Sequence, residues 1–404
     1  MLSRKQFLTA SLALGLATLA APAAAQKKYD PGATDTEIKI GQTMPYSGPA
    51  SAYGVIGKTE AAYFKMVNDN GGINGRKINF ISLDDGYSPP KTVEMARRLV
   101  EQEEVLFLVN TLGTPPNSAI HKYMNTKKVP HLFLATGASK WNDPKNFPWT
   151  MGFNPNYHSE GKLYAQEILR TKPNAKVAVL FQNDDYGKDY LQGFKDGLGP
   201  KAKAMIVAEA SYEVTDPTVD SQIVTLQGSG ADTFFNITTP KFAAQAIRKV
   251  ADIGWKPMHY LNQVSASVGS VLKPAGLDKS VGLISMQYVK DPTDPTWKDD
   301  PAMKDYFAFL KKYAPDVGLD DGNAAYGYAV AQLTTQLLKQ AGDNLTRENI
   351  MKQAASLKEY QVPMVITGIH ANTNAGDFAP FQTMQLARFD GKTWVPFGKP
   401  VDVK

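Results

Sequence analysis

The sequence contains no cysteine in its 404 residues. A chain without cysteine has no disulfide, no thiolate nucleophile, no cysteine-based zinc site and no lipid-modified N-terminal cysteine. It also lacks a strong charge of either sign, because 44 Lys and Arg stand against 39 Asp and Glu and leave a formal net charge of +5. So small an excess predicts no nucleic-acid partner. The 43% hydrophobic and 21% charged residues are normal for a globular protein of two or three domains.

Motifs typical of nucleotide-binding and hydrolytic enzymes are absent as well. The sequence holds no Gly-x-Gly-x-x-Gly and no Gly-x-Ser-x-Gly, which are the dinucleotide fingerprint and the nucleophile elbow. Gly57-Lys58-Thr59 resembles the end of a phosphate-binding loop, but Ala52 stands where that loop needs glycine. We interpret this segment as a helix N-terminus. The histidines have no metal-ligand spacing, so we predict no catalytic residue, no cofactor and no metal.

The first 25 residues have the pattern of a secretory signal. Arg4 and Lys5 form a basic start, residues 7–21 are apolar, and Ala23-Ala24-Ala25 predicts cleavage after Ala25. The alternative is an uncleaved membrane anchor, but the apolar run of about 15 residues is shorter than the roughly 20 that span a bilayer. No later stretch is apolar enough to span one. We therefore expect residues 1–25 to be removed and the mature protein to be periplasmic, where a cysteine-free chain avoids disulfide chemistry.

Strand-like and helix-like segments alternate along the rest of the chain. Continuous apolar segments lie between amphipathic ones, a pattern typical of parallel strands covered by helices on both faces. The expected strands are 38–42, 77–83, 105–109, 131–135, 177–181, 205–208, 233–237, 259–261 and 281–289, with further strands from 365 and a hairpin at Asp390-Gly391. The expected helices are 55–69, 89–104, 115–128, 159–171, 186–198, 219–228, 241–253, 301–313, 323–341 and 346–357. Because the alternation runs through twice, we predict an α/β fold with two similar, Rossmann-like lobes.

A set of short motifs follows the same order along the chain. The set comprises Ile38-Lys39-Ile40-Gly41, Ser47-Gly48-Pro49, Tyr53-Gly54, the turn from Asn68 to Arg76, Asp84-Asp85, Val129-Pro130, Asp185-Tyr186-Gly187 and Phe389-Asp390-Gly391. Over residues 35–398 it resembles the periplasmic branched-chain amino-acid-binding proteins. The resemblance implies a type I solute-binding protein of an ABC importer, in which two lobes, each a mainly parallel sheet flanked by helices, are joined by three hinge crossings and close on a ligand.

The resemblance also implies a division of the chain and a set of partners. Residues 26–150 and 287–376 would form lobe 1, and residues 151–286 and 377–404 would form lobe 2. The partners would be a small carboxylate-bearing molecule and the membrane permease of an ABC transporter, and the protein would act as a monomer. A ligand-sensing regulator and a hydrolase on the same scaffold are the rival classes.

Two loops are implied to hold the ligand carboxylate. In the family, a loop after the third strand uses a hydroxyl and backbone N–H groups, and here it is Thr111-Leu112-Gly113-Thr114, with Thr114 at the hydroxyl position. The loop after the fourth strand is Ala135-Thr136-Gly137. Gly137 stands where the family has threonine, so that hydroxyl is either lost or supplied by Thr136.

Further pocket residues are implied in both lobes. Tyr53 matches a pocket tyrosine of lobe 1, and we count Tyr46 as a second candidate in that lobe. Tyr186 matches a tyrosine of lobe 2 that faces the ligand across the cleft. Thr239 stands where the family has another tyrosine.

The most informative departure from the family pattern is Gln263, which stands where amino-acid binders have an acid that pairs with the ligand α-ammonium. An ammonium buried without a counter-charge is costly, and glutamine carries no charge. We therefore expect a carboxylate ligand without an α-ammonium, such as an aromatic or aliphatic organic acid. The alternatives are a neutral amide ligand, an amino-acid ligand with Asp184 or Asp185 replacing the missing acid, or a family register that is shifted here by one residue.

Overall fold

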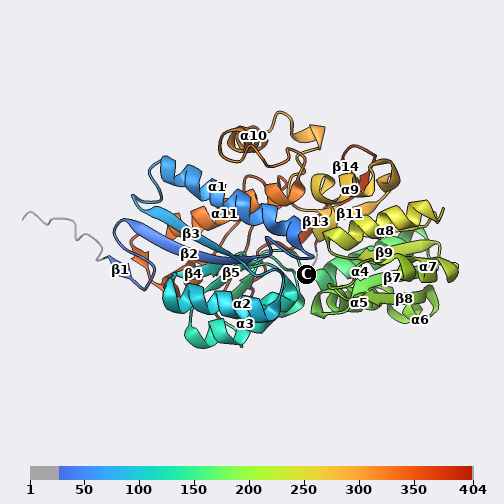
Figure 1. Ribbon diagram of the computed structural model, residues 1–404, viewed down its shortest axis with the longest axis horizontal. Helices are drawn as coiled ribbons and strands as arrows, with labels where there is room; N and C mark the ends of the chain where they lie inside the picture. The colour runs from blue at the N-terminus through green and yellow to red at the C-terminus, as the bar shows by residue number, and fades with distance from the viewer. Residues whose placement is uncertain (1–26, 403–404) are drawn as a thin grey trace, which may run out of the picture.

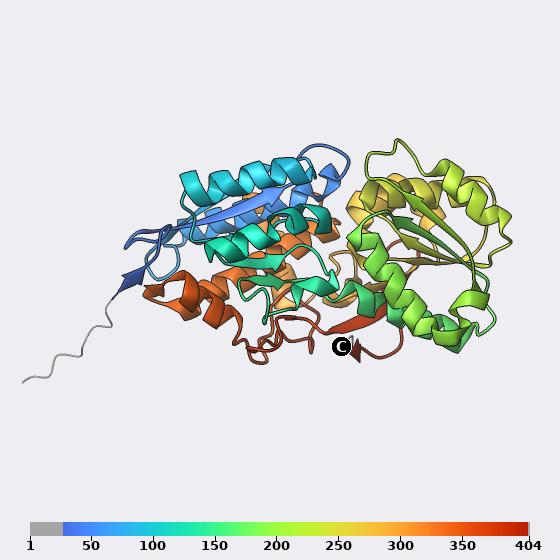
Figure 2. The ribbon, with the colours of Figure 1, turned by 90° about the horizontal axis from the view of Figure 1, so that it is seen from below.

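The computed structural model describes residues 27–402, and these residues form two layered α/β lobes side by side (Figure 1, Figure 2). Each lobe is defined here by its β-sheet, with five strands in lobe 1 and eight in lobe 2. The predicted two-lobed α/β fold is confirmed. The predicted signal at residues 1–25 lies outside the described residues. Within residues 27–402, no helix combines the length and the apolar character that a membrane crossing requires.

Lobe 1 contains a parallel sheet with the strand order β3-β2-β4-β5-β6. Side chains of β4 alternate between its faces, because Phe107 and Val109 join the core beneath α1 and α11 while Leu108 joins the core beneath α2 and α3. The strands are β2 (Glu37–Met44), β3 (Lys77–Asp84), β4 (Phe107–Val109), β5 (His131–Leu134) and β6 (Thr150–Gly152). The helices are α1 (Gly54–Asp69), α2 (Pro89–Arg97), α3 (Thr114–Lys127), α10 (Pro301–Tyr313), α11 (Gly322–Ala341) and α12 (Arg347–Ala354).

Lobe 2 contains a mixed sheet with the order β14-β13-β11-β10-β9-β7-β8, and β15 also pairs with β13. Val177 and Val179 face α4 and α5, while Ala178 and Leu180 face α7 and α8. The strands are β7 (Val177–Gln182), β8 (Ile206–Tyr212), β9 (Thr233–Ile237), β10 (Met258–Leu261), β11 (Ile284–Gln287), β13 (Thr383–Phe389), β14 (Trp394–Pro396) and β15 (Val401–Asp402). The helices are α4 (Tyr157–Thr171), α5 (Asp185–Leu198), α6 (Ala202–Met205), α7 (Asp220–Gly228), α8 (Pro240–Asp252) and α9 (Lys273–Ala275).

Three segments differ from the sequence prediction. The helix predicted over 89–104 ends as an α-helix at Arg97 and continues as a π-helical turn over 98–102. The strand predicted over 281–289 is limited to 284–287, because the chain then leaves the sheet. Residues 365–382 form isolated bridges instead of a strand, because this stretch runs back between the lobes before it enters β13.

The chain passes between the two sheets three times, after β6, after β11 and before β13. Each crossing contributes one aromatic ring to a shared cluster. The ring centroids of Phe153 and Phe381 lie 5.0 Å apart, those of Tyr288 and Phe381 5.7 Å, and those of Phe153 and Tyr288 6.3 Å. The division at 150/151, 286/287 and 376/377 stays a prediction, which we propose as the limits of the two lobes.

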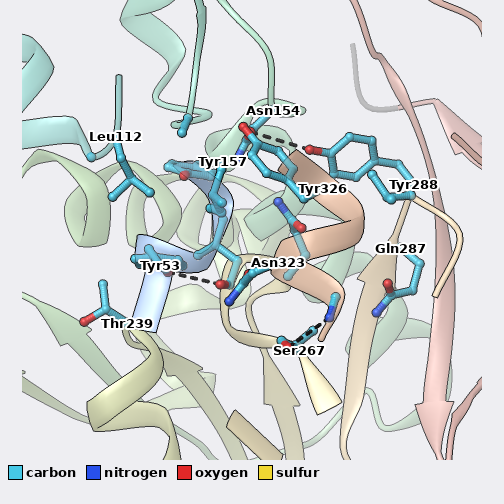
Figure 3. Close-up of a pocket in the computed structure, with 18 of the residues that line it drawn as sticks. Tyr53, Leu112, Asn154, Tyr157, Thr239, Ser267, Gln287, Tyr288, Asn323 and Tyr326 are labelled. Atoms are coloured by element: carbon cyan, nitrogen blue, oxygen red, sulfur yellow. Dashed lines mark hydrogen bonds between the residues drawn. The ribbon is translucent and has the colours of Figure 1, made fainter. Parts of the chain in front are cut away.

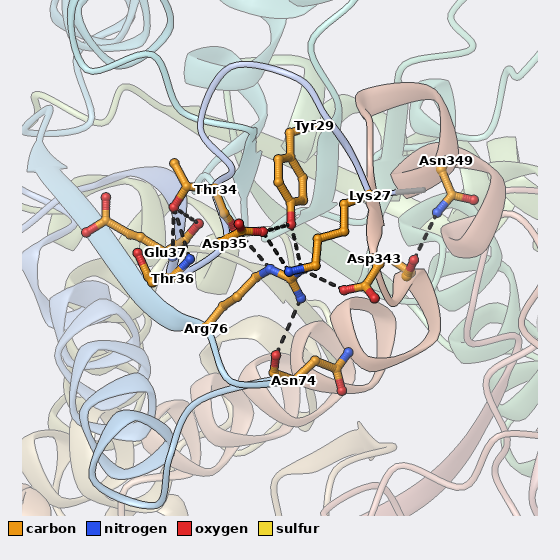
Figure 4. Close-up of polar contacts among 11 residues, drawn as sticks. Lys27, Tyr29, Thr34, Asp35, Thr36, Glu37, Asn74, Arg76, Asp343 and Asn349 are labelled. Carbon is orange, nitrogen blue, oxygen red and sulfur yellow. Dashed lines mark hydrogen bonds and ion pairs between the residues drawn. The ribbon is translucent and has the colours of Figure 1, made fainter. Parts of the chain in front are cut away.

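Arg76 holds the first residues of the described chain against lobe 1 (Figure 4). Its side chain is only 2% exposed, and its guanidinium donates to Asp343 at 2.6 Å, to the Tyr29 hydroxyl at 2.8 Å and to the Thr34 carbonyl at 3.0 Å. These bonds hold β1 (Lys28–Tyr29) beside β12 (Asn344–Leu345), with which it pairs in parallel. The five N–H donors of an arginine side chain are held in a fixed planar fork, whereas a lysine side chain ends in a compact ammonium. Lysine therefore cannot make the same set of bonds here.

Candidate functional site

A cavity lies between the lobes, at the carboxyl ends of several strands, where open α/β sheets generally place their ligands. Its empty volume, including its opening to solvent, is about 820 Å³. Lobe 1 contributes the loops after β4 and β5, lobe 2 contributes the loops after β9 and β10, and the second crossing and the start of α11 close one side.

The loop after β4 brings a helix N-terminus to this cavity. Gly113 has a φ of 95°, and a Cβ there would lie 2.3 Å from the Tyr87 ring, so only glycine fits. The next residue, Thr114, begins α3, and no side chain caps this helix. Because Pro115 and Pro116 carry no N–H, the first free donor of α3 is the N–H of Thr114. The partial positive charge of a helix N-terminus favours an anion at this point.

A small hydrogen-bond network determines what the Thr114 hydroxyl can do. Thr136 Oγ1 accepts from the Trp141 indole N–H at 3.1 Å and from the Ala138 N–H at 3.3 Å. It also lies 2.6 Å from Thr114 Oγ1. Either hydroxyl could be the donor of this bond, and since two acceptor positions of the Thr136 hydroxyl are filled, we infer that Thr136 donates to Thr114. The hydrogen of Thr114 is therefore left to donate into the cavity.

Gly137 cannot be replaced by the threonine of the family pattern. A Cβ at this position would lie 2.1 Å from the Pro155 carbonyl oxygen and 2.7 Å from the Tyr157 ring. Tyr157 itself lines the cavity. The room that a threonine side chain would need is thus occupied by an aromatic ring, and the Thr136 hydroxyl serves Thr114 instead of a ligand.

Tyrosines make up much of the cavity wall (Figure 3). Asn262 donates to the Tyr186 hydroxyl at 2.7 Å, and Tyr326 accepts from Asn110 at 2.9 Å and donates to Asn154 at 2.8 Å. These bonds fix ring orientations, so the wall is largely preformed. The lining tyrosines are Tyr53, Tyr87, Tyr157, Tyr186, Tyr288 and Tyr326. Such rings present flat apolar surface with a polar edge, which suits a ligand with an apolar body.

Direct contacts between the lobes close this cavity. The Tyr53 hydroxyl donates to the Val264 carbonyl at 3.0 Å, and the Ser139 hydroxyl donates to Asp189 at 2.8 Å. On the side of α11, the Ser267 hydroxyl donates to Asp321 at 2.9 Å. The structure is therefore a closed form, in which both lobes contact one another around the ligand space.

Gln263 faces the cavity from the end of β10. Its backbone N–H donates to Glu160 Oε1 at 2.8 Å, while its side-chain amide makes no hydrogen bond to any residue of 27–402. Glu160 also accepts from the hydroxyls of Tyr164 and Tyr190, and burial raises the pKa of its carboxyl to about 7. The Gln263 backbone is thus fixed and its amide is available to a ligand.

Asp184 and Asp185, the acids that could replace the missing charge, both have other partners. Asp184 caps α5 by accepting from the N–H groups of Tyr186 and Gly187, and Asp185 pairs with Lys140 at 2.6 Å. Neither lines the cavity. The lining acid is Asp291, on the second crossing, where burial raises its pKa to about 6.

Lys290, the basic residue among those lining the cavity, is 4% exposed and already paired. Its ammonium lies 2.8 Å from Asp300 and 5.2 Å from the centre of the Trp297 ring. A ligand anion therefore gains little from this cation. The hydroxyl and backbone N–H of Thr114 are among the donors left for a carboxylate.

The structure brings most of the predicted site residues together around one cavity. The lining includes Tyr53, Leu112, Gly113, Thr114, Ala135, Tyr186, Thr239 and Gln263. Tyr46, Thr136 and Gly137 lie outside it: the Tyr46 hydroxyl bonds Ser82 at 2.6 Å, and the other two support the wall from behind. The sequence reasoning missed Asn154, Tyr157, Gln287, Tyr288, Asp291, Asn323 and Tyr326. No local motif marks these residues, and the order of the strands alone would have indicated the crossing segments.

Comparisons with known proteins agree with this geometry. A family model described as periplasmic binding protein matches residues 37–393. Leu/Ile/Val-binding protein homolog 1 of Brucella suis biovar 1 is 26% identical over 340 residues, which cover 81% of this chain and 85% of the relative.

Solved structures share the fold. A branched chain amino acid ABC transporter protein from Thermus thermophilus with bound valine has a TM-score of 0.81 at 15% identity, over 91% of this chain and 97% of that one. A solute binding protein of an ABC transporter from Rhodopseudomonas palustris BisB5, in complex with 3,4-dihydroxy benzoic acid, has a TM-score of 0.76 at 18% identity, over 92% and 98%.

The family model spans most of the chain, and the two-lobed fold is that of the solved structures. The resemblance inferred from the motifs is thereby confirmed, and the family implies a periplasmic location. The chain belongs to the periplasmic binding protein family, as a solute-binding protein of the ABC-transporter type.

Proposed function

We propose that this protein binds a small organic acid without an α-ammonium group and delivers it to the permease of an ABC importer. The observation that carries the proposal is that Thr114 and Gln263 line the same cavity. Thr114 offers a hydroxyl hydrogen and a helix N-terminal N–H to an anion. Gln263 offers a neutral amide where an ammonium would need a charge.

The tyrosine-lined wall supports an acid with an aromatic or aliphatic body. Six rings line the cavity, and the hydroxyls of Tyr53, Tyr186 and Tyr326 are engaged by protein partners. What these rings leave for the ligand is mainly apolar surface, which stabilises a bound hydrocarbon by roughly 25 cal/mol for each Å² that it removes from water. The solute-binding protein that holds 3,4-dihydroxy benzoic acid shows that this fold accommodates such a ligand.

The mechanism is ligand-dependent closure. Lobe 1 would hold the carboxylate at Thr114, and lobe 2 would close over it through contacts such as Tyr53 to Val264. Exclusion of water strengthens each polar contact within the cavity. A ligand shifts the equilibrium toward the closed form only by the difference between its affinities for the two forms. The closed form, as a monomer, would then dock on the permease, and no bond of the ligand would be made or broken.

An amino-acid or amide ligand is the second candidate, and Asp291 is the observation that favours it. This carboxyl lines the cavity and would be largely ionised above its pKa of about 6. In an α-amino acid, however, the ammonium lies next to the carboxylate. Its counter-charge must therefore lie beside the Thr114 loop, whereas Asp291 belongs to the second crossing.

Titration calorimetry separates these candidates. Protein would be unfolded in guanidinium and refolded to remove any ligand that it carries, and then titrated with leucine, isoleucine, valine and a panel of benzoates and cinnamates. We expect at least one acid of the panel to bind with a micromolar or tighter Kd. Tight leucine binding with no binding of any aromatic acid would refute the proposal. Turnover of ester or amide substrates would instead support a hydrolase.

A further inference from the structure

Two buried amide groups face the cavity without a hydrogen-bond acceptor. Among residues 27–402, neither Asn323 Nδ2 nor Gln287 Nε2 has a partner, and both residues line the cavity. The Asn323 side chain is 9% exposed. Buried polar groups in native proteins are nearly always paired, because an unmade hydrogen bond costs stability. Two such exceptions in one cavity need an explanation.

The surroundings show that these amides are not part of the local framework. Asp321 caps α11 by accepting from the backbone N–H of Asn323 at 3.0 Å, and it also accepts from Ser267 and Ser270. The backbone of Asn323 is thus fixed at the start of a 20-residue helix, while its side chain is left over. Figure 3 shows the Asn323 amide projecting from α11 into the space among the tyrosines, and Gln287 lies beside Tyr288.

The cavity lining also contains an acceptor. Asp291 uses Oδ1 to accept from the N–H and the hydroxyl of Thr293, at 2.7 Å and 2.5 Å, and its Oδ2 has no partner in the described chain. Gln287 and Asp291 lie four residues apart on the second crossing. Lys290, the neighbour of Asp291 in the sequence, is occupied by Asp300. The cavity lining therefore contains two unpaired amide donors and one carboxylate oxygen that has no partner among the described residues.

We infer that Asn323, Gln287 and Asp291 form a second polar subsite that binds a hydroxyl group at the far end of the ligand. A hydroxyl oxygen accepts hydrogen bonds from an amide N–H, and its hydrogen is donated to a carboxylate. A second carboxylate would instead be repelled by Asp291. The inference rests on the proposed function, since the other end of the ligand is the carboxylate at Thr114. It defines the ligand more narrowly, as a hydroxylated acid.

The test uses sets of acids that differ only at the far end. Benzoate, cinnamate and 3-phenylpropionate, which cover different lengths, would each be titrated as the parent, the para-hydroxy and the para-methoxy compound. We expect a para-hydroxy acid to bind about tenfold or more tightly than its parent, the factor that corresponds to a hydrogen bond with a charged group such as the Asp291 carboxylate. The methoxy acid, which accepts but cannot donate, is expected to bind less tightly than the hydroxy acid.

Apolar variants of similar shape assign the effect to these residues. In Asn323→Leu, and in Gln287→Met, the preference for the hydroxy acid over its parent, measured as the ratio of their two Kd values, should fall by about threefold or more. Thr335→Val, on the same helix but outside the lining, is the matched control and should keep the full preference. Without ligand, the melting temperature of Asn323→Leu should stay level or rise, because the variant removes an unpaired group. If the Asn323 amide instead stabilised the fold, the variant would lower the melting temperature.

The outcomes distinguish the inference from the proposed function. If parent and hydroxy acids bind equally, or if Asn323→Leu keeps the preference, the second subsite is refuted while the acid-binding function stands. A methoxy acid that binds as tightly as the hydroxy acid would refute the role of Asp291 as a hydrogen-bond acceptor. It would also refute the inference that the ligand carries a hydroxyl group. If no acid of any set binds, the proposed function itself fails.

Discussion

The hydroxyl of Tyr53, in lobe 1, donates a hydrogen bond to the backbone carbonyl of Val264, in lobe 2, at 3.0 Å across the cavity. The Tyr53 side chain is buried in the closed form, next to the residues that line the ligand space. This bond exists only while the lobes are together, so its free energy contributes to closure and not to the folding of either lobe.

Tyr53→Phe is expected to weaken ligand binding without unfolding the protein. A neutral hydrogen bond contributes about 1 kcal/mol, so the loss should raise Kd by roughly fivefold. Calorimetry with the best-binding acid and a thermal melt of the ligand-free protein check both parts. Tyr123→Phe is the control, because its hydroxyl donates to Glu101 far from the cavity. An unchanged Kd would show that this contact does not contribute to closure.

Thr114→Val should reduce the affinity for acids strongly. A hydrogen bond to a charged group contributes about 1.5–3 kcal/mol, so Kd should rise by roughly 10- to 100-fold, while Thr114→Ser should stay near the original value. Thr136→Val should behave differently, because it removes the acceptor of the Trp141 indole N–H and the Ala138 N–H. We expect that variant to lose stability in a denaturant titration. Equal effects of Thr114→Val and Thr114→Ser would contradict the donor role of the hydroxyl.

Gln263→Glu should exchange one ligand class for another. The new carboxylate would repel a bound acid but pair with an α-ammonium, so binding of the organic acid should fall by at least tenfold and binding of leucine or valine should increase. Calorimetric titrations of the original protein and of Gln263→Glu, each with an organic acid and with leucine or valine, measure the exchange. Gln263→Met, which removes the amide without adding a charge, is the matched control. If Gln263→Glu binds the acid as before, the ligand carboxylate does not lie near this residue.

Glu160 should make stability depend on pH. Burial raises the pKa of its carboxyl to about 7 in the folded protein, from a reference value of 4.5. A raised pKa means that the folded state holds the proton more tightly, so the contribution is complete below about pH 4.5 and is lost as pH rises through about 7. This loss would amount to about 3 kcal/mol at most.

Glu160→Gln keeps an acceptor for the Gln263 N–H and removes the titration. Relative to the original protein, we expect this variant to gain stability steadily between pH 5 and pH 8 in urea titrations. A constant difference between the two proteins over this range would show that Glu160 does not titrate there.

The alternation of apolar and amphipathic segments was sufficient to predict the two lobes. Burial on both faces of a parallel strand, as at Val177 and Ala178, requires continuous apolar residues, and that requirement is visible in a single sequence. Helix ends set by local chemistry were also predictable, such as the glycine that follows α8 at Gly254. The short strand β6 was not, because three residues carry too little pattern.

The cavity was predictable only where motifs mark it. The loop of Thr114 was found through its resemblance to a family pattern, and the structure explains its glycine by the nearby Tyr87 ring. Asn323 and Tyr157 begin ordinary helices, so nothing in their neighbourhood distinguishes a lining residue from a surface residue. Whether a threonine side chain could fit at Gly137 depends on the position of the Tyr157 ring. That position is known only after the first crossing is placed.

The shared aromatic cluster constrains how the two halves can separate. Phe153, Tyr288 and Phe381 belong to different crossings yet pack on one another, so bending one connecting strand alone would open a void against the other two rings. Opening with the least loss of packing is a rotation that passes through this cluster and keeps the three rings in register. We therefore expect the joint between the lobes to act as a single pivot when they separate.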